Sequence, residues 1–454
     1  MPAPLVVAAA LGAGAAGGAA LAVDVPLGVA FVSALCFGPL VLLNLPAGIA
    51  TWSGLSYVDA LPVLGVAPLA TFLIVLLAWV GAAATRGSEI LVRLREERAR
   101  LALVGGLVLW IVLSFAWATR PELGTEVLLE WLTAGALFAI VATALGDARS
   151  VRLVLAALVV GAVASVLVGL TSEDLTQSAS ALETAEEAGR LRGGSGDPNF
   201  LAAGLVPAAV VAGGLLASTR RPLTRILLIA AIGIMAIGFA AAESRGGLVA
   251  LVVAVVAAFV VFRGARAYVA TFVTFLVGVA ALWFVLNPAA WERVTTFDRQ
   301  GNGRSDLWSV AWQIGADHPV EGVGVNNFRA ESPNYVRRPG TLEFVDLIAE
   351  KPKVAHNVFL QLFAEVGLVG LGLFAAVLVA CFAASARAAR RLAKAGQTEL
   401  ATLSRTVLVA GIAGWASAVF LSNGTDRRLW ILLAVGVALH GLALRASSRS
   451  MPTP

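Results

Sequence analysis

The sequence predicts an all-α membrane protein: a polytopic helical bundle of about 12 transmembrane helices (between about 11 and 13), built as a single domain over residues 1–454. Charged residues make up only 13% of the 454 residues and hydrophobic residues 59%, whereas soluble domains hold about 25% charged residues. The charges are also clustered, and the uncharged runs between them are long enough to cross a hydrocarbon core about 30 Å thick. These observations exclude a soluble globular protein.

Apolar runs with at most one charge mark the predicted membrane segments. Arg86 is the first basic residue, so the N-terminus lacks the positive region of a cleaved signal peptide, and the first run is expected to stay in the mature protein. That run is rich in Ala and Gly and only weakly hydrophobic, so the number of spans before residue 85 is the least fixed. The candidate runs lie near 5–22, 25–43, 60–84, 101–118, 128–146, 153–170, 199–217, 226–242, 246–262, 267–286, 358–381, 406–421 and 429–444.

The distribution of basic residues predicts the orientation of the bundle, because cytoplasmic loops retain Arg and Lys and short translocated loops lack them. Nineteen basic residues lie in the connections on one side, and six lie in the short connections on the other. The long segment 287–357 falls on the poor side, so we expect an extracytoplasmic loop inserted between membrane helices. Within it, the stretch from Ser305 to Gly315 has the helical spacing of an amphipathic surface helix. We therefore predict a multi-pass protein of the cytoplasmic (inner) membrane, in contact with membrane lipids.

Cysteine content and net charge exclude other classes of protein. Cys36 and Cys381 lie far apart in apolar runs, which excludes a disulfide scaffold and a zinc ribbon. The net charge of +5 follows from basic residues that set membrane topology, so no nucleic-acid partner is expected. His440 lies in the last apolar run, where we expect it to pack or to form hydrogen bonds.

Polar groups that border apolar runs on the predicted external side are candidates for chemistry, because charge at membrane depth is costly. The first group is a glycine-rich turn that contains Arg190 and Arg192 and ends at Asn199, with the sequence R-L-R-G-G-S-G-D-P-N. Backbone N–H groups at a helix start, with two arginines beside them, suit an anionic ligand. A solvated loop that enters a membrane helix is the alternative interpretation.

The second group is the short turn E-S-R-G-G, which places Arg245 at the external mouth of a helical hairpin. A guanidinium group binds phosphate oxygens in a two-pronged fashion, although an arginine that only extends to the membrane interface gives the same pattern. The third group begins at Arg304 and continues to a tight glycine turn from His318 to Gly324. On its own it fits an ordinary surface helix followed by a turn.

The fourth group is His356 and Asn357, directly before a long apolar helix. Histidine takes up a proton near neutral pH, so this position suits a general base that faces the external compartment. The alternative is a polar cap over the helix start, with Asn357 as the N-cap.

Taken in order, these four groups resemble the O-antigen ligase and polymerase superfamily of bacterial polysaccharide assembly. The resemblance covers about residues 186–430 and rests on the R-x-x-G…D-P-N element, the S-R-G turn, the R…W…H-P…G-x-G run and the H-N-x-x-L…G-x-x-G helix. It implies a membrane glycosyltransferase that moves a glycan from undecaprenyl (polyprenyl) diphosphate to an acceptor hydroxyl on the extracytoplasmic face. The implied catalytic residues are Arg190, Arg245 and His356, and the implied substrate-binding residues are Arg192, Asn199, Arg304 and Asn357.

No metal and no cofactor are expected, because arginines can neutralise the departing diphosphate, and a single displacement would invert the anomeric carbon. The sequence leaves the identity of the acceptor open. A lipid core would make the protein an O-antigen ligase, a second lipid-linked repeat would make it a polymerase, and a protein side chain would make it an O-glycosylating enzyme. A transporter or flippase for polysaccharide or lipid-linked glycan is the alternative from another class. The gathering of polar groups at one face favours the transferase, because transporter sites usually lie near the midplane between related halves.

Overall fold

The computed structural model describes residues 25–59, 61, 67–85, 87–171, 189–288, 291–292, 303–336 and 354–449. It confirms the predicted fold class, because these residues form α-helices and short 3-10 helices and no strand. The first predicted apolar run, 5–22, lies outside the described residues.

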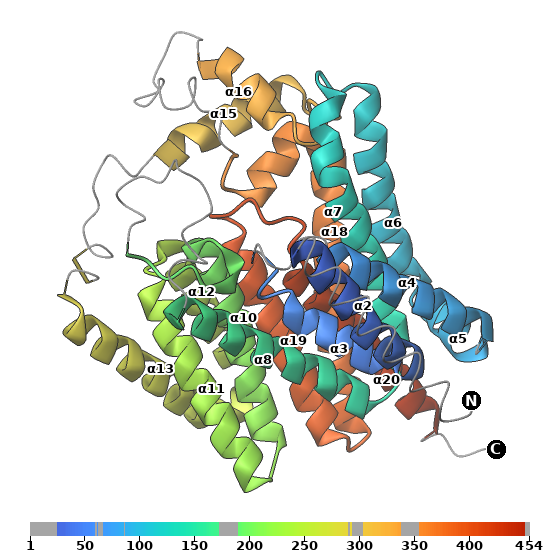
Figure 1. The fold of residues 1–454 in the computed structure, drawn as a ribbon, viewed down its shortest axis with the longest axis vertical. Helices are drawn as coiled ribbons and strands as arrows, with labels where there is room; N and C mark the ends of the chain where they lie inside the picture. The colour runs from blue at the N-terminus through green and yellow to red at the C-terminus, as the bar shows by residue number, and fades with distance from the viewer. Residues whose placement is uncertain are drawn as a thin grey trace.

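Long helices joined by short connections make up the bundle (Figure 1). The first half contains α2 (Val25–Leu43), α3 (Leu45–Leu55), α4 (Ala67–Thr85), α5 (Gly87–Glu96), α6 (Arg98–Leu113), η2 (Ser114–Ala116), α7 (Pro121–Ala144), α8 (Ala148–Thr171), η4 (Gly193–Ser195) and α10 (Pro198–Ser218). The second half contains α11 (Pro222–Ala241), α12 (Arg245–Val261), η5 (Arg263–Ala265), α13 (Arg266–Leu286), α15 (Gly303–Asp317), α16 (Phe328–Val336), α18 (Val358–Lys394), α19 (Thr398–Ser417) and α20 (Arg427–Arg449).

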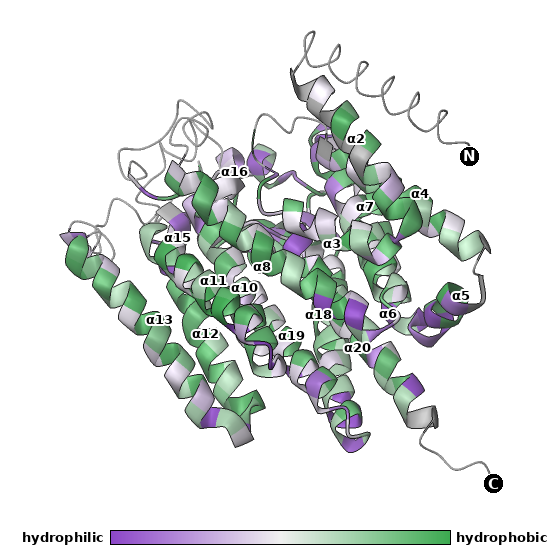
Figure 2. Cartoon of the chain, turned by 60° about the horizontal axis from the view of Figure 1, so that its bottom comes forward, coloured by the Kyte–Doolittle hydropathy of each residue, from purple (hydrophilic) through white to green (hydrophobic). Residues whose placement is uncertain are grey.

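Within the described residues, nine helices are long and apolar enough to cross a membrane, or ten if the bent α4–α5 pair counts as one span. α12, with 17 residues, is a shorter apolar helix. Every predicted apolar run from 25–43 onward has a matching helix. The total of 12 spans stays a prediction. Hydrophobic residues cover the long helices, and hydrophilic residues concentrate at α5 and near the helix ends (Figure 2).

The centre of the bundle is formed by α10, α19 and α20, whose apolar windows are mostly buried, whereas α13 lies at the periphery with an exposed window (Figure 1). α10 packs against α8, α11, α12 and α19. Small residues on both helices permit the close approach of α12: a Cβ added to Gly247 of α12 would lie 2.8 Å from the Cβ of Ala202 in α10. Small residues of this kind are common where membrane helices pack together.

α18 has 37 residues and is broken near its start. Gly367 has φ 66° and ψ −170°, a conformation that only glycine adopts readily. The turn after α15 fills the break: the N–H of Leu368 donates to the carbonyl of Pro319 (2.8 Å), and the N–H of Gly324 donates to the carbonyl of Glu365 (2.8 Å). The backbone groups released by the break are thus paired inside the protein, as membrane proteins require.

Charged residues hold the helices together at the end of the bundle that includes the α5–α6 junction. Glu97 is buried there, and its carboxylate lies 2.7 Å from Nδ1 of His440 in α20 and also pairs with Arg100. Arg445 pairs with Glu96 at 2.9 Å. His440 therefore forms a hydrogen bond within its helix packing, as the sequence predicted.

Candidate functional site

Four segments that are distant in sequence meet at the opposite end of the bundle: the loop 189–197, the α11–α12 turn 242–244, the first turns of α15, and the α19–α20 connection 418–426. Hydrogen bonds join the first two segments, as described below. Phe420, in the α19–α20 connection, contacts both α15 and α12. Its ring lies 5.8 Å from that of Trp308 in α15, and a Cβ added to Gly246 of α12 would lie 3.0 Å from the Cβ of Phe420. We call this region the α15 end of the bundle.

A hydrogen bond brings Arg190 and Asn199, at the two ends of the glycine-rich loop, together. Nε of Arg190 donates to the carbonyl of Ala242 (3.0 Å), and Nη2 donates to Oδ1 of Asn199 (3.1 Å). Asn199 follows the N-cap of α10, Asp197, whose carboxylate accepts from the N–H groups of Asn199 (2.7 Å) and Phe200 (2.9 Å). The loop is therefore fixed both to its own helix and to the α11–α12 turn.

The α11–α12 turn brings Arg245 to the Arg190 loop. Oγ of Ser244 donates to Oδ1 of Asn199 (2.9 Å) and accepts from the N–H of Gly247 (3.2 Å), which makes Ser244 the N-cap of α12. Arg245 is the first residue of that helix and is exposed. Oδ1 of Asn199 thus connects Arg190 with the residue before Arg245. This contact brings two of the predicted catalytic residues to one location.

Arg192 and the glycines after it face the interior of the bundle. The Arg192 side chain is 7% exposed, and the N–H of Gly194 donates to Oγ of Ser165 in α8 (3.0 Å). Gly193 has φ 58° and approaches the carbonyl of Ser165 so closely that a Cβ would lie 2.8 Å away. The glycine-rich sequence is therefore needed for close contact with α8, and Arg192 lies deeper in the bundle than Arg190.

His356 precedes α18, and Asn357 is the N-cap of that helix. Oδ1 of Asn357 accepts from the N–H groups of Phe359 (3.0 Å) and Leu360 (3.1 Å), so the capping interpretation holds for Asn357. His356 is partly exposed and has φ 50°, a left-handed conformation that is uncommon for a residue with a side chain. The N–H of Val358 donates to the carbonyl of Ala418 (2.9 Å), so His356 borders the same α19–α20 connection that Phe420 places against the Arg245 helix.

Arg304 lies in the first turn of α15, and the predicted surface helix is present as Gly303–Asp317. Its apolar side is buried against α18, because Leu307, Val310, Ala311 and Ile314 are at most 3% exposed. The tight turn after it also forms, with φ 70° at Gly322 and 95° at Gly324. Trp308, one turn beyond Arg304, connects this helix to Phe420.

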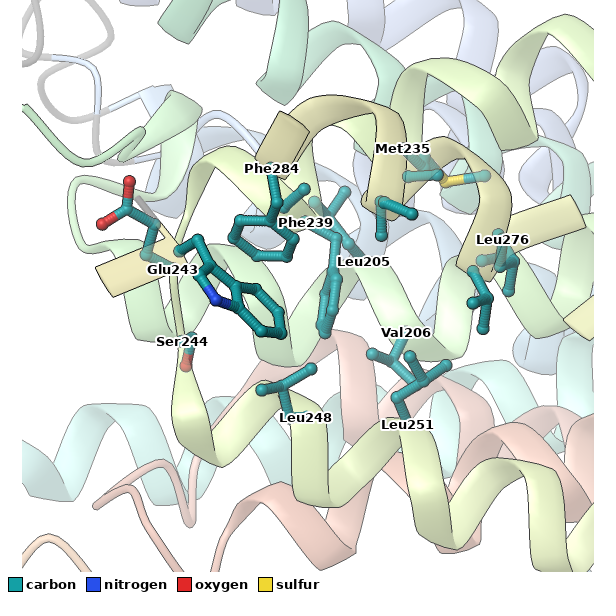
Figure 3. Close-up of a pocket in the computed structure, with 17 residues that line it drawn as sticks. Leu205, Val206, Met235, Phe239, Glu243, Ser244, Leu248, Leu251, Leu276 and Phe284 are labelled. Atoms are coloured by element: carbon teal, nitrogen blue, oxygen red, sulfur yellow. The ribbon is translucent and has the colours of Figure 1, made fainter. Parts of the chain in front are cut away.

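An apolar cavity of about 370 Å³ opens beside the α11–α12 turn. It lies between α10, α11, α12 and α13, and Glu243 and Ser244 form one end of it, whereas Met235 and Leu276 lie at the other (Figure 3). Phe239 and Phe284 point into it from α11 and α13. The cavity therefore runs from the Arg245 turn along the transmembrane helices, and almost all of its lining is hydrocarbon or aromatic.

The α19–α20 connection and the start of α20 contribute residues that the sequence analysis did not single out. Asp426 forms an ion pair with Arg428 at 2.6 Å, and Arg427 pairs with Asp59 at 2.9 Å. Burial raises the pKa of the Asp59 carboxyl, an effect that Arg427 opposes. The available signal was the polar run S-N-G-T-D-R-R between two apolar helices.

Tyr57, which follows α3, joins this cluster. Its ring lies 5.1 Å from the guanidinium carbon of Arg428, and its hydroxyl donates to the carbonyl of Gly204 in α10 (3.2 Å). Burial raises the pKa of the Tyr57 hydroxyl, so it stays protonated and able to donate. The cluster thus fixes the start of α20 against α3 and α10.

Comparison with known protein families gives a match over part of the chain. The model of the O-antigen ligase family matches residues 230–375. The match includes the S-R-G turn, α15, the glycine turn and the His356 segment, whereas Arg190, Arg192 and Asn199 lie before it. No curated protein matches the sequence. The many apolar helices and this family match over residues 230–375 support an integral membrane protein and a glycan-transfer enzyme of the O-antigen ligase superfamily.

Proposed function

We propose that the protein transfers a glycan from undecaprenyl or another polyprenyl diphosphate to an acceptor hydroxyl, in the manner of an O-antigen ligase. The observation that carries the proposal is the position of the apolar cavity. The cavity begins at Glu243 and Ser244, next to Arg190 and Arg245. A polyprenyl diphosphate has the matching chemistry, an anionic headgroup on a long hydrocarbon chain. The isoprene units nearest the diphosphate occupy the cavity, and the rest of the chain stays in the lipid.

Arg190 and Arg245 bind the diphosphate in this proposal. Oδ1 of Asn199 accepts from the Arg190 guanidinium (3.1 Å) and from the Ser244 hydroxyl (2.9 Å), so it holds the Arg190 side chain directly and also holds the turn that precedes Arg245. Planar guanidinium groups bind two phosphate oxygens at once and stabilise the charge that develops as the diphosphate leaves. The N-termini of α10 and α12 add favourable partial charge. Guanidinium charge in this position allows the reaction to proceed without a metal ion.

His356 is the proposed general base. It accepts the proton of the acceptor hydroxyl as the hydroxyl oxygen bonds to the anomeric carbon and the bond from that carbon to the diphosphate oxygen breaks. The electron pair of the broken bond goes to the diphosphate, and the proton passes from His356 to solvent. One displacement of this kind inverts the anomeric carbon. The reaction takes place on the extracytoplasmic side of the inner membrane, and the acceptor is a lipid core, a growing glycan or a protein.

The substitution Arg245→Lys tests the proposed diphosphate clamp. Lysine keeps the charge but loses the two-pronged fit, so transfer from a polyprenyl diphosphate-linked glycan in reconstituted membranes should fall about 10-fold or more. Arg221→Lys, an exposed residue in the connection before α11, is the matched control and should leave the rate unchanged. Full transfer by Arg245→Lys would contradict the clamp. Movement of the lipid-linked glycan across the membrane without transfer would favour a flippase.

A further inference from the structure

Buried polar atoms without a hydrogen-bond partner are concentrated at the α19–α20 connection. The described residues contain ten such side-chain atoms, and four of them belong to Ser422, Asn423 and Arg428. Both ends of the Asn423 amide, Oδ1 and Nδ2, are among them, although the residue is only 2% exposed. A buried amide with neither end paired is destabilising, so it is rare in native proteins and calls for an explanation.

The chain around Asn423 is held firmly in place. The N–H of Asp426 donates to the carbonyl of Asn423 (3.0 Å), and Nε1 of Trp430 donates to the carbonyl of Gly424 (2.9 Å). Oγ1 of Thr425 donates to the Glu130 carboxylate of α7 (2.7 Å). The backbone on the C-terminal side of Asn423 and the Thr425 hydroxyl are therefore paired, whereas the Asn423 amide, the Ser422 hydroxyl and Nη1 of Arg428 are not. Because the backbone that carries this buried amide is held in place, little further ordering of the connection would be needed to bind a ligand.

The charges beside Asn423 indicate a neutral ligand. The carboxylate of Asp426 binds Nε and Nη2 of Arg428 (2.9 and 2.6 Å), and Asp59 pairs with Arg427. Because each guanidinium has a carboxylate partner, this cluster is balanced in charge and does not favour an anion. An amide offers a donor and an acceptor together, which matches hydroxyl groups, since each hydroxyl both donates and accepts.

Asn423 is also near in the chain to residues that contact the segment of the proposed diphosphate clamp and that of the proposed base. Three residues before it, Phe420 contacts Gly246, the neighbour of Arg245. One residue after it, a Cβ added to Gly424 would lie 3.5 Å from Cγ1 of Val358, two residues beyond His356. Such short chain distances keep Asn423 within about 10 Å of either contact.

We propose that Asn423 binds hydroxyl groups of the donor sugar that is attached to the diphosphate, and so helps to place the anomeric carbon between Arg245 and His356. The inference rests on the proposed function. It assigns to Asn423 a role in recognising the glycan and none in binding the lipid diphosphate, so the two roles are separable by experiment.

The test compares two lipids, undecaprenyl diphosphate and the same lipid carrying its glycan, for binding to the purified full-length protein. Asn423→Leu and Asn423→Ala should weaken binding of the glycan-bearing lipid roughly 5- to 100-fold, the range expected for losing two hydrogen bonds. Binding of undecaprenyl diphosphate should change by less than about twofold. Equal weakening for both lipids, or none for either, would overturn the inference. Failure of the unsubstituted protein to bind either lipid would instead overturn the proposed function.

Thermal unfolding supplies a second measurement that does not depend on activity. Asn327 is the matched control, because it is fully buried and its amide is paired: Nδ2 donates to the carbonyls of Arg120 (3.2 Å) and Val325 (3.0 Å), and Oδ1 accepts from the N–H of Arg120 (2.8 Å). Asn327→Leu should lower the unfolding temperature, whereas Asn423→Leu or Asn423→Ala should leave it unchanged or raise it. Destabilisation of both Asn423 variants as large as that of Asn327→Leu would show a structural role and overturn the inference.

Discussion

Strained backbone conformations mark the candidate site at the scale of single residues. Among the described residues other than glycine, Glu243, Asn326 and His356 have positive φ angles of 47°, 58° and 50°. Glu243 and His356 belong to the two segments proposed to hold the diphosphate and the base, and Asn326 belongs to the turn that fills the α18 break. Such conformations cost free energy and concentrate at functional sites, where the surrounding structure enforces them. The strain at His356 therefore supports a role that depends on its position.

Substitutions at His356 should separate the contribution of its side chain to transfer from the cost of its backbone conformation to stability. Glycine adopts positive φ without penalty, so His356→Gly should be about 1 kcal/mol more stable than His356→Ala. Both variants should lose transfer by about 10²–10⁴-fold, the usual effect of removing a general base, while donor binding persists. Added imidazole should restore part of the activity of His356→Gly. Unfolding curves, donor binding and transfer rates measure these effects.

Ala355→Gly is the control for the stability comparison. Ala355 is fully buried and is not among the residues with positive φ, so glycine there should reduce stability by about 0.5–1 kcal/mol. The base assignment would be contradicted if His356→Ala lost donor binding while the turnover of bound donor stayed normal. His356 would then be a diphosphate ligand.

At the scale of elements, the break in α18 joins the His356 segment to the turn after α15. A Cβ on Gly367 would collide with the carbonyl of Val320, and its φ and ψ angles are those of glycine alone. Gly367→Ala should therefore destabilise the protein by about 1–3 kcal/mol or more. Gly372→Ala, in the regular part of the same helix with no atom within 4 Å of the added Cβ, should be neutral or stabilising by up to about 1 kcal/mol. Thermal unfolding of the two variants measures the difference, and equal stability would contradict a structural role for the break.

The sequence predicted the separate parts of this arrangement but not the contact between the turn and the α18 break. Helical spacing identified α15, the glycines identified the turn from His318 to Gly324, and Asn357 was recognised as a possible N-cap. The pairing of the turn with the α18 break depends on backbone contacts between residues some forty positions apart, such as Val323 with Ala364. Periodicity and capping rules describe only local structure. They did not predict the positive φ angle of Gly367, which entered the sequence analysis only through the G-x-x-G element.

For the whole molecule, composition and charge clustering sufficed to predict the all-α membrane bundle, because the hydrocarbon core dictates helix length and excludes charge. The motif order sufficed to predict the superfamily. The location of Asn423 was not predictable in the same way, because a single Asn in a polar connection resembles any other. Its burial and its unpaired amide arise only when α7, α12, α18 and α20 pack around the connection.

The orientation of the whole molecule in the membrane can be tested with single cysteines in a variant whose Cys36 and Cys381 are replaced by alanine. Asn334 in α16 and Gln397 before α19 are both exposed and lie on opposite sides of the predicted membrane. An impermeant thiol reagent added to intact cells, with the outer membrane permeabilised where one is present, should label Asn334→Cys. It should label Gln397→Cys only after the inner membrane is opened, since 19 of the basic residues lie on the Gln397 side. The reverse pattern would place Arg190, Arg245 and His356 in the cytoplasm, where an extracytoplasmic acceptor cannot reach them, and the proposed reaction would then be excluded.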